Sequence, residues 1–294
     1  MPSVATFRCN AVRRVVFGTD FSPVAERAAT YARGLALSFS AKVDVVHVFD
    51  PDLFLNDDEP RLRTFDERLE VRSKRLDALG AAFSAMGVWT KTELAVAQPS
   101  WAGLLKAAED ASADLIVVAT RSKAQFKRLF VGSTVEELIR HATQPVLTVG
   151  PHAAVVEDGP LRFQRIVYAT DFTPEAEKAA QCALWFALHD GASLNVCHVV
   201  DCRENPVEID AAAEGDVREN LERLISASPL GEYGCELTVA YGAPAQEILA
   251  LAEKVNADLI VLGPRRHSFW LTHVRRGVSL EVLAKAQCPV LTVH

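Results

Sequence analysis

The amino-acid sequence contains the same pattern twice. Residues 15–23 (VVFGTDFSP) return as 166–174 (IVYATDFTP), and residues 113–118 (ADLIVV) return as 257–262 (ADLIVL). The pentapeptide PVLTV then closes each copy. Three matched blocks in the same order indicate a duplicated globular domain, because the repeat is far longer than the period of a solenoid.

The length of the chain and its Gly-Pro pairs indicate a division into two parts. The 294 residues fit two domains of ordinary size, each long enough to bury its own core. A Gly-Pro pair stands at each end of residues 150–160, as is typical of a linker. We therefore predict a first domain over residues 1–150, a linker over 151–162 and a second domain over 163–294.

Composition narrows the class of protein. With 49% hydrophobic and 23% charged residues, the chain is typical of a soluble globular protein. The net charge of −7 argues against nucleic-acid binding, which needs a basic face to displace phosphate counterions. No apolar run approaches the roughly 20 residues that span a bilayer, and the N-terminus lacks the apolar core of a signal peptide. We expect a cytoplasmic protein that binds neither nucleic acid nor membrane.

Cysteine and histidine side chains are expected to be structural. The six cysteines show no C-x-x-C spacing, so we expect small buried side chains, with a redox role for Cys197 and Cys202 as the alternative. His47 and His198 each end a predicted strand, and we expect them to be buried and hydrogen-bonded. No spacing typical of metal ligands occurs.

Strand and helix patterns alternate through both copies. Short apolar segments typical of buried strands lie near 14–17, 43–48, 92–97, 115–119 and 146–149, and near 165–169, 193–199, 235–240, 259–262 and 290–293. This alternation predicts a parallel sheet with helices on both faces, so that a ligand would bind at the carboxyl ends of the strands. One long amphipathic helix is expected between 62 and 86, and its charged residues, among them Arg68, Arg72 and Arg75, are expected on a solvated surface.

A turn after the first predicted strand is the first candidate for chemistry. It consists of Gly18-Thr19-Asp20, and Ser22-Pro23 then indicates a helix N-cap with proline at the first helical position. The Asp20 carboxylate accepts hydrogen bonds either from the sugar or base of a ligand or from backbone N–H groups of its own turn. Both interpretations stay open at this point.

The second candidate is the loop after the fourth predicted strand. It runs from Ala119-Thr120-Arg121-Ser122 to Gly132-Ser133-Thr134 and is basic in between. Small residues let a backbone approach phosphate groups, and the N-terminus of the following helix favours an anion through its N–H groups and dipole. The alternative is an ordinary exposed connection with solvated lysine side chains.

Together these blocks resemble the universal stress protein family, over about residues 12–149 and 163–294. The resemblance rests on the Thr-Asp-Phe turn, the His-Val pair that ends the second strand of each copy, the Ala-Asp-Leu-Ile-Val strand and the PVLTV ending. It implies two tandem, doubly wound α/β domains, each with a five-stranded parallel sheet in the order 3-2-1-4-5.

The ATP-binding branch of that family carries G-x-x-G, nine residues and then G-S/T after the fourth strand. The resemblance implies ATP as the ligand, accompanied by Mg²⁺. By this mapping, the adenosine end is lined by Thr19, Asp20 and Val48. The loop positions that match or adjoin the glycine motif are Ala119, Arg121, Ser122, Gly132, Ser133 and Thr134, of which the last three would hold phosphates.

The sequence departs from the motif in both copies. In the first copy, Ala119 and Ser122 replace glycines, and their side chains disfavour positive φ. In the second copy, Gly263 keeps the first glycine, whereas Arg266 takes the second and Arg276 takes the position of Gly132 in an alignment without gaps. We expect the second copy to bind ATP poorly or not at all.

The resulting hypothesis is a stress-response binding and regulatory module with one adenine-nucleotide site, in the first domain. The alternative is a nucleotide-free scaffold in which the two copies form a pseudo-dimer within one chain, with a homodimer of chains as a further level of assembly. A slow ATPase is the least favoured reading, because no Walker A pattern and no evident general base accompany the site. We therefore expect a protein that is not an enzyme.

Overall fold

The computed structural model describes residues 12–51, 64–120, 131–202, 211–226, 230–264 and 277–294. The described residues form two compact units, one from the range 11–162 and the other from the range 163–294. No helix in these described ranges is long and apolar enough to cross a membrane.

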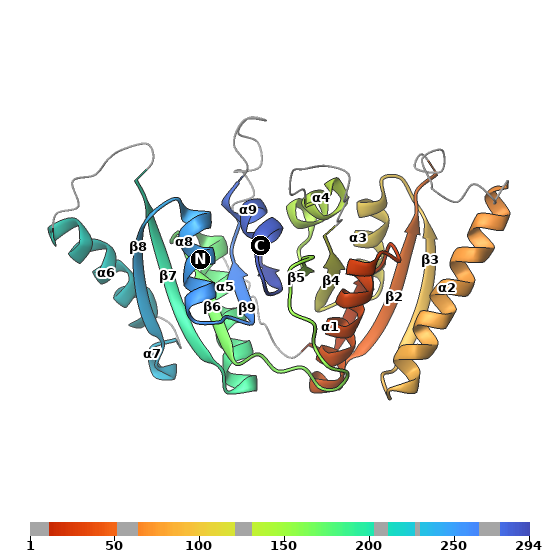
Figure 1. Cartoon of the computed structure of the whole chain (residues 1–294), viewed down its shortest axis with the longest axis horizontal. Coiled ribbons are helices and arrows are strands. Elements are labelled where there is room, and N and C mark those ends of the chain that lie inside the picture. Colours follow the sequence, from red (N-terminus) through yellow and green to blue (C-terminus); the bar gives the residue numbers. More distant parts are fainter. Residues whose placement is uncertain (1–11, 52–63, 121–130, 203–210, 227–229, 265–276) are drawn as a thin grey trace, which may run out of the picture. The chain divides into compact units, whose positions relative to one another are not determined.

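The first unit contains a five-stranded parallel sheet. Its strands are β1 (Arg14–Gly18), β2 (Lys42–Phe49), β3 (Thr90–Val96), β4 (Leu115–Ala119) and β5 (Val146–Val149). Strand β1 pairs with both β2 and β4, while β3 pairs with β2 and β5 pairs with β4. The order is therefore β3-β2-β1-β4-β5 (Figure 1). The parallel α/β fold predicted from the alternation is confirmed.

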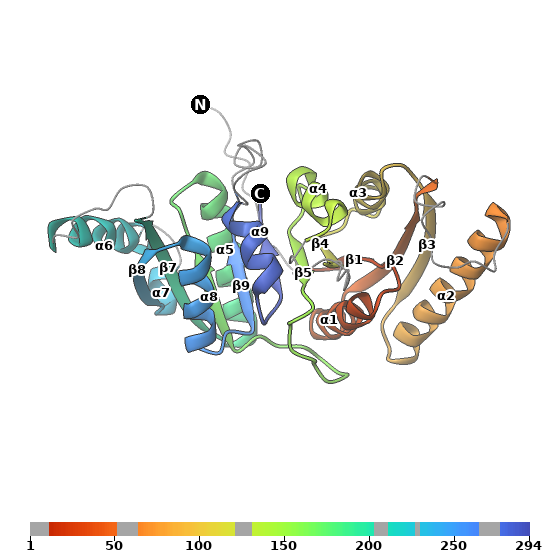
Figure 2. The same ribbon diagram turned by 45° about the horizontal axis from the view of Figure 1, so that its top comes forward.

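Helices cover both faces of this sheet. They are α1 (Pro23–Phe39), α2 (Phe65–Ala85), α3 (Ser100–Asp110) and α4 (Ser133–His141). Figure 2 shows α1 and α2 on one face and α3 and α4 on the other. On the first face, the rings of Phe17 and Phe83 stack with centroids 6.0 Å apart. On the other face, Leu104 of α3 packs so closely on Gly18 that a Cβ there would lie 2.6 Å from it. Because both faces are covered, the strands β1, β4 and β5 are almost entirely apolar.

The second unit repeats this arrangement. Its elements are β6 (Arg165–Ala169), α5 (Pro174–Asp190), β7 (Ser193–Asp201), α6 (Ala211–Ser226), α7 (Leu230–Tyr233), β8 (Glu236–Gly242), α8 (Pro244–Lys254), β9 (Leu259–Leu262), α9 (Val278–Lys285) and β10 (Val290–Thr292). The pairings of its strands give the order β8-β7-β6-β9-β10. The two shorter helices α6 and α7 stand where the first unit has the single helix α2 (Figure 1).

The repeated aspartate of the ADLIV block joins two strands in each unit. The Asp114 carboxylate accepts hydrogen bonds from the backbone N–H groups of Arg13 and Arg14, at 2.8 and 2.9 Å. Asp258 accepts equivalent bonds from residues 164 and 165, at 2.8 and 3.0 Å. Burial raises the pKa of Asp258, and these backbone bonds oppose that rise. The recurrence of this residue therefore has a structural cause.

The segment 151–162, predicted to be a linker, is bonded to the first unit. Two side chains of helix α1 donate hydrogen bonds to carbonyl oxygens of this segment. Arg27 donates to Pro151 (2.6 Å) and Ala153 (2.7 Å), and Tyr31 donates to Ala154 (2.9 Å). The backbone N–H of Leu161 donates to the carbonyl of Gly34, at 3.0 Å. A Cβ on Gly34 would lie 2.8 Å from Leu161 Cβ, so the absence of a side chain permits this approach. The segment is thus an ordered flank of α1.

Candidate functional site

The turn after β1 is held by its own polar side chains. Thr19 Oγ1 accepts a hydrogen bond from the N–H of Phe21, and Asp20 Oδ1 accepts one from the N–H of Ser22, both at 3.0 Å. Ser22 Oγ in turn caps α1 by accepting from Ala25 N–H at 3.2 Å. One Asp20 oxygen therefore satisfies backbone groups, as the structural interpretation required, while the residue itself is exposed at the sheet edge.

Phe21 is the conformationally unusual residue of this turn. Its φ of +59° lies in the left-handed region, which costs a residue with a side chain about 1–2 kcal/mol. Its ring lies 4.6 Å from the imidazole of His47, measured between centroids. His47 Nδ1 lies 2.7 Å from the Thr19 carbonyl oxygen, to which it donates as the protonated ring nitrogen. Burial lowers the pKa of His47, whereas this hydrogen bond opposes the effect, so the buried, hydrogen-bonded role expected for this residue is confirmed.

The second unit builds the same turn. Thr170 Oγ1 accepts from Phe172 N–H at 3.1 Å, and Asp171 Oδ1 accepts from Thr173 N–H at 3.2 Å. Phe172 has a φ of +61°, and its ring centroid is 4.4 Å from that of His198. His198 Nδ1 lies 2.8 Å from the Thr170 carbonyl oxygen, and burial lowers its pKa as well. The turn is therefore a property of the fold in both units.

Val48 and Ala119 lie at the same edge of the first sheet. Val48 follows His47 on β2 and faces the opposite side, where a Cβ on Gly103 of α3 would meet it at 2.8 Å. Phe17 pairs with Val117, so the ends of β1 and β4 lie side by side and bring Thr19 near the level of Ala119. The carboxyl edge thus gathers Thr19, Asp20, Val48 and Ala119, as predicted for a doubly wound fold.

Gly132 gives α4 an N-terminus without a side-chain cap. It is the N-cap residue with φ +60° and ψ 135°, and no described side chain bonds to the first turn of this helix. Ser133 is exposed and Thr134 half-buried at the first two helical positions. By contrast, Ser22 caps α1, and Thr64 closes a capping box on α2. In a β4–α4–β5 crossover, α4 begins at the carboxyl edge, where its first N–H groups favour an anion.

The remaining predicted loop residues lie outside the described part of the chain. They are Arg121 and Ser122 in the first copy and the basic positions 265–276 in the second.

The second unit uses its glycines differently. A Cβ on Gly263 would lie 2.4 Å from the carbonyl oxygen of Glu175 and 2.5 Å from Ala176 Cα, so this glycine is needed for the approach of α5. Gly277 is the N-cap of α9, with an ordinary φ of −59°, and no residue of the described ranges lies within 4 Å of a Cβ placed on it. The glycine that matches the motif at 263 therefore has a packing role, and α9 lacks the positive φ found at Gly132.

The charged face predicted for α2 is only partly solvated. Arg68 and Arg72 are buried, with 7% and 9% of their surface exposed, so the prediction was wrong for these two residues. The Arg72 guanidinium lies 5.1 Å from the Phe49 ring centroid, and that of Arg75 lies 4.5 Å from the Phe21 ring centroid. Their spacing of i, i+4 and i+7 puts all three on one stripe of the helix, and this signal was available in the sequence.

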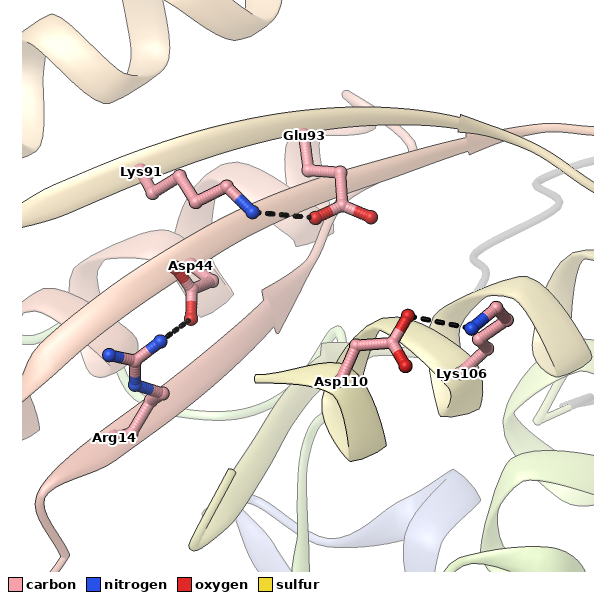
Figure 3. A network of polar contacts seen from close by, with 6 residues as sticks. All are labelled: Arg14, Asp44, Lys91, Glu93, Lys106 and Asp110. Atoms are coloured by element: carbon pink, nitrogen blue, oxygen red, sulfur yellow. Dashed lines mark hydrogen bonds and ion pairs between the residues drawn. The ribbon is translucent and has the colours of Figure 1, made fainter. Parts of the chain in front are cut away.

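Polar pairs near the amino ends of the strands have a structural role. Figure 3 shows three of them, Arg14 with Asp44 at 3.3 Å, Lys91 with Glu93 at 3.1 Å and Lys106 with Asp110 at 2.7 Å. Asp44 is buried within β2, where one of its oxygens bonds to Arg14. The first pair joins β1 to β2, whereas the other two lie within β3 and within α3.

Cysteines and metal ligands add no further site among the described residues. Cys182, Cys197 and Cys288 are buried free thiols, as expected for small apolar side chains, whereas Cys202 and Cys235 are free thiols that are only half-buried. Burial raises the pKa of Cys197 to about 12, which suppresses the reactive thiolate at neutral pH. Within the described ranges, no group of His, Cys, Asp and Glu residues is arranged to hold a metal ion.

Fold and turns define the class of protein: a duplicated, doubly wound α/β chain with matching carboxyl-edge turns. The sequence model of the universal stress protein family matches residues 11–150 and 162–294, and the chain belongs to that family.

Similar proteins carry the same family name. A universal stress protein of Methanocaldococcus jannaschii is 32% identical over 142 residues, which are 48% of this chain and 83% of the relative. One of Thermus aquaticus is 32% identical over 139 residues, which are 47% of this chain and 98% of the relative. The crystal structure of a universal stress protein from Archaeoglobus fulgidus covers 96% of both chains with a TM-score of 0.72 at 22% identity, and so has the same tandem fold.

Proposed function

We propose that the first domain binds an adenine nucleotide, ATP with its Mg²⁺, and that the chain acts as a stress-response regulatory module. The observation that carries the proposal is the N-terminus of α4, where Gly132 adopts a positive φ and no described side chain caps the helix. A backbone turn without a Cβ lets phosphate oxygens approach the first N–H groups of a helix.

Most of the predicted residues have a direct role in this proposal. Asp20 would accept hydrogen bonds from ribose hydroxyl groups, and Thr19, Val48 and Ala119 would line the adenosine end. Phosphates would bind the N–H groups of Gly132, Ser133 and Thr134, with Arg121 adding positive charge. Mg²⁺ would enter with the phosphates and neutralise part of their charge.

The second domain is proposed not to bind nucleotide. Gly263 is explained by its packing against α5, and Gly277 has an ordinary φ. Neither residue supports a phosphate site of the kind proposed at Gly132.

A nucleotide-free scaffold is the second candidate function. In its favour, Asp20 and Asp171 each accept a hydrogen bond from a backbone N–H group of their own turn. They do so in both units, although the segments after β4 and β9 differ in sequence. Ser122→Gly separates the two functions. It should tighten nucleotide binding if residue 122 approaches phosphate, whereas a scaffold predicts no change.

The decisive measurement is calorimetric titration of ATP into the purified chain, with chromatographic identification of any nucleotide released on denaturation. Gly132→Ala should weaken binding about tenfold or more, because its Cβ opposes the required φ. Gly87→Ala is the matched control: Gly87 also has a positive φ, +85°, but follows α2 in open space. No copurified nucleotide and no heat at millimolar ATP would reject the proposal.

We also propose a cytoplasmic location, a pseudo-dimer of the two copies within the chain, and no catalytic activity. Phosphate release from ATP should then be no faster with the protein than in buffer. A clearly faster release would favour the slow ATPase instead.

A further inference from the structure

The turn that holds Thr19 and Asp20 is fixed by a stack of three side chains in the first unit. The Phe21 ring contacts the His47 imidazole, with centroids 4.6 Å apart, and the Arg75 guanidinium lies 4.5 Å from the same ring centroid. Arg75 also donates from Nη2 to the carbonyl oxygen of Phe21, at 3.3 Å. The residue with the unusual φ is therefore held by both its ring and its carbonyl group.

The stack connects directly to the predicted ligand-binding residues. His47 donates to the carbonyl of Thr19, and the N–H of Phe21 donates to the Thr19 hydroxyl. Thr19, Phe21 and His47 thus close a ring of contacts, and Arg75 joins it from α2. Any movement of Phe21 would displace the two residues on its N-terminal side, Thr19 and Asp20.

Helix α2, which carries Arg75, is packed closely against the sheet. Leu76 is 2% exposed, and a Cβ on Gly80 would lie 2.4 Å from the Thr92 methyl group, so the helix lies directly on β3. Phe83 stacks on Phe17 of β1. An arginine on this face reaches the turn from a rigid support, and its planar guanidinium suits stacking on an aromatic ring.

In the second unit the corresponding helix is α6, and its arginines Arg218 and Arg223 form ion pairs at the surface. Arg218 pairs with Glu222 at 3.4 Å, and Arg223 pairs with Glu219 at 2.7 Å. In the second turn the Phe172 ring lies against His198, as Phe21 lies against His47 in the first. Within the described ranges, an arginine lies over the phenylalanine ring only in the first turn. The difference falls in the unit for which the nucleotide site is proposed.

We propose that Arg75 is a positioning residue for the first domain: through Phe21 it fixes the Thr19–Asp20 turn in the conformation that receives the ligand. The part of this inference that concerns ligand affinity rests on the proposed nucleotide function. The part that concerns the turn does not, because it can be measured on the protein alone.

The test measures hydrogen exchange at the amides of Phe21 and Ser22 in the full chain. Arg75→Met keeps a long side chain but removes the cation and its donors, and it should speed exchange about tenfold. Arg75→Lys should restore part of the protection, because it keeps the charge without the planar group. Arg218→Met on α6 is the control for loss of an exposed arginine, and it should leave these amides unchanged.

Two further readouts separate positioning from a general loss of stability. Burial is the main cause that lowers the pKa of His47, and the charges of Arg72 and, more weakly, Arg75 add to it, while the hydrogen bond to Thr19 and the charge of Asp20 oppose it. Arg75→Met should therefore raise this pKa slightly in an NMR titration of the imidazole. Phe21→Leu is a second variant, which removes the aromatic ring that Arg75 contacts instead of removing the arginine. It should speed exchange in the same way.

The ATP titration completes the experiment. If wild-type protein binds ATP, Arg75→Met should weaken binding about tenfold and Arg75→Lys less. Unchanged exchange at Phe21 and Ser22 in both Arg75→Met and Phe21→Leu would overturn the positioning role. Faster exchange with unchanged ATP affinity would overturn its link to the ligand. If wild-type protein binds no ATP, the proposed function fails, and the exchange result still decides whether Arg75 fixes the turn.

Discussion

The two copies share their first turn and differ after their fourth strand. Asp20 and Asp171 accept the same backbone hydrogen bond, and Phe21 and Phe172 share the same left-handed φ. After β4, Gly132 has a positive φ, whereas the N-cap after β9, Gly277, does not. What both copies keep is what the fold requires. Evidence for a ligand must therefore come from the features in which they differ.

The glycine at the end of the fourth strand illustrates how a motif can mislead. Gly263 matches the nucleotide motif and Ala119 does not, which taken alone would favour the second copy. The structure gives Gly263 a different cause, since the backbone of α5 lies where its Cβ would be. A glycine that matches a ligand motif can thus be required for packing alone.

The largest change in unfolding free energy is expected for a substitution at Gly263. Gly263→Ala should destabilise the second unit by about 3 kcal/mol, because backbone atoms at 2.4 and 2.5 Å cannot yield as a flexible side chain would. Urea-induced unfolding followed by tryptophan fluorescence measures the change. The reverse substitution, Ala119→Gly, is the control and should cost about 0.5–1 kcal/mol through backbone entropy alone. Equal effects would show that the two positions are equivalent after all.

A smaller difference is expected at the two helix N-caps. Gly132→Ala should cost about 1–2 kcal/mol, because the residue has a φ of +60°. Gly277→Ala should change the unfolding free energy by less than about 0.5 kcal/mol, since its φ is −59° and no described residue lies within 4 Å of a new Cβ. Thermal unfolding of the two variants side by side tests this. A similar loss in both would contradict the distinction drawn between the two loops.

The smallest expected effect is on the pH dependence of stability, and it arises from the histidine that both copies have beside the first turn. Because burial lowers the pKa of His47 and His198, the unfolded chain binds more protons near and below the ordinary pKa of about 6.5. Stability is therefore complete above that pH and falls as the pH drops toward the folded-state pKa values. Each histidine contributes at most about 1.4 kcal/mol per pH unit.

His47→Gln and His198→Gln should each flatten this pH dependence between pH 7 and 5. The measurement is the unfolding free energy from urea titrations at a series of pH values. If the two turns are built alike, the two variants behave alike. A pH dependence that neither variant alters would assign it to other groups.

The fold and the shared turn could be predicted from the sequence because their signals are local. Strand positions follow from apolar runs, and Ser22-Pro23 fixes the start of α1. The burial of Arg68 and Arg72 could not be assigned from charge alone, because it depends on what α2 packs against; Arg72, for example, lies over the Phe49 ring of β2. The close approach of α5 to Gly263 was also invisible, since it joins residues far apart in the chain.

The flank of α1 formed by residues 151–162 decides where the gene can be divided. A stop codon after Gly150 would remove the carbonyl groups that accept from Arg27 and Tyr31 and the backbone that covers Gly34. A stop codon after Arg162 would keep them. The repeat ends at its last strand, but the first copy as a folded object ends a full segment later.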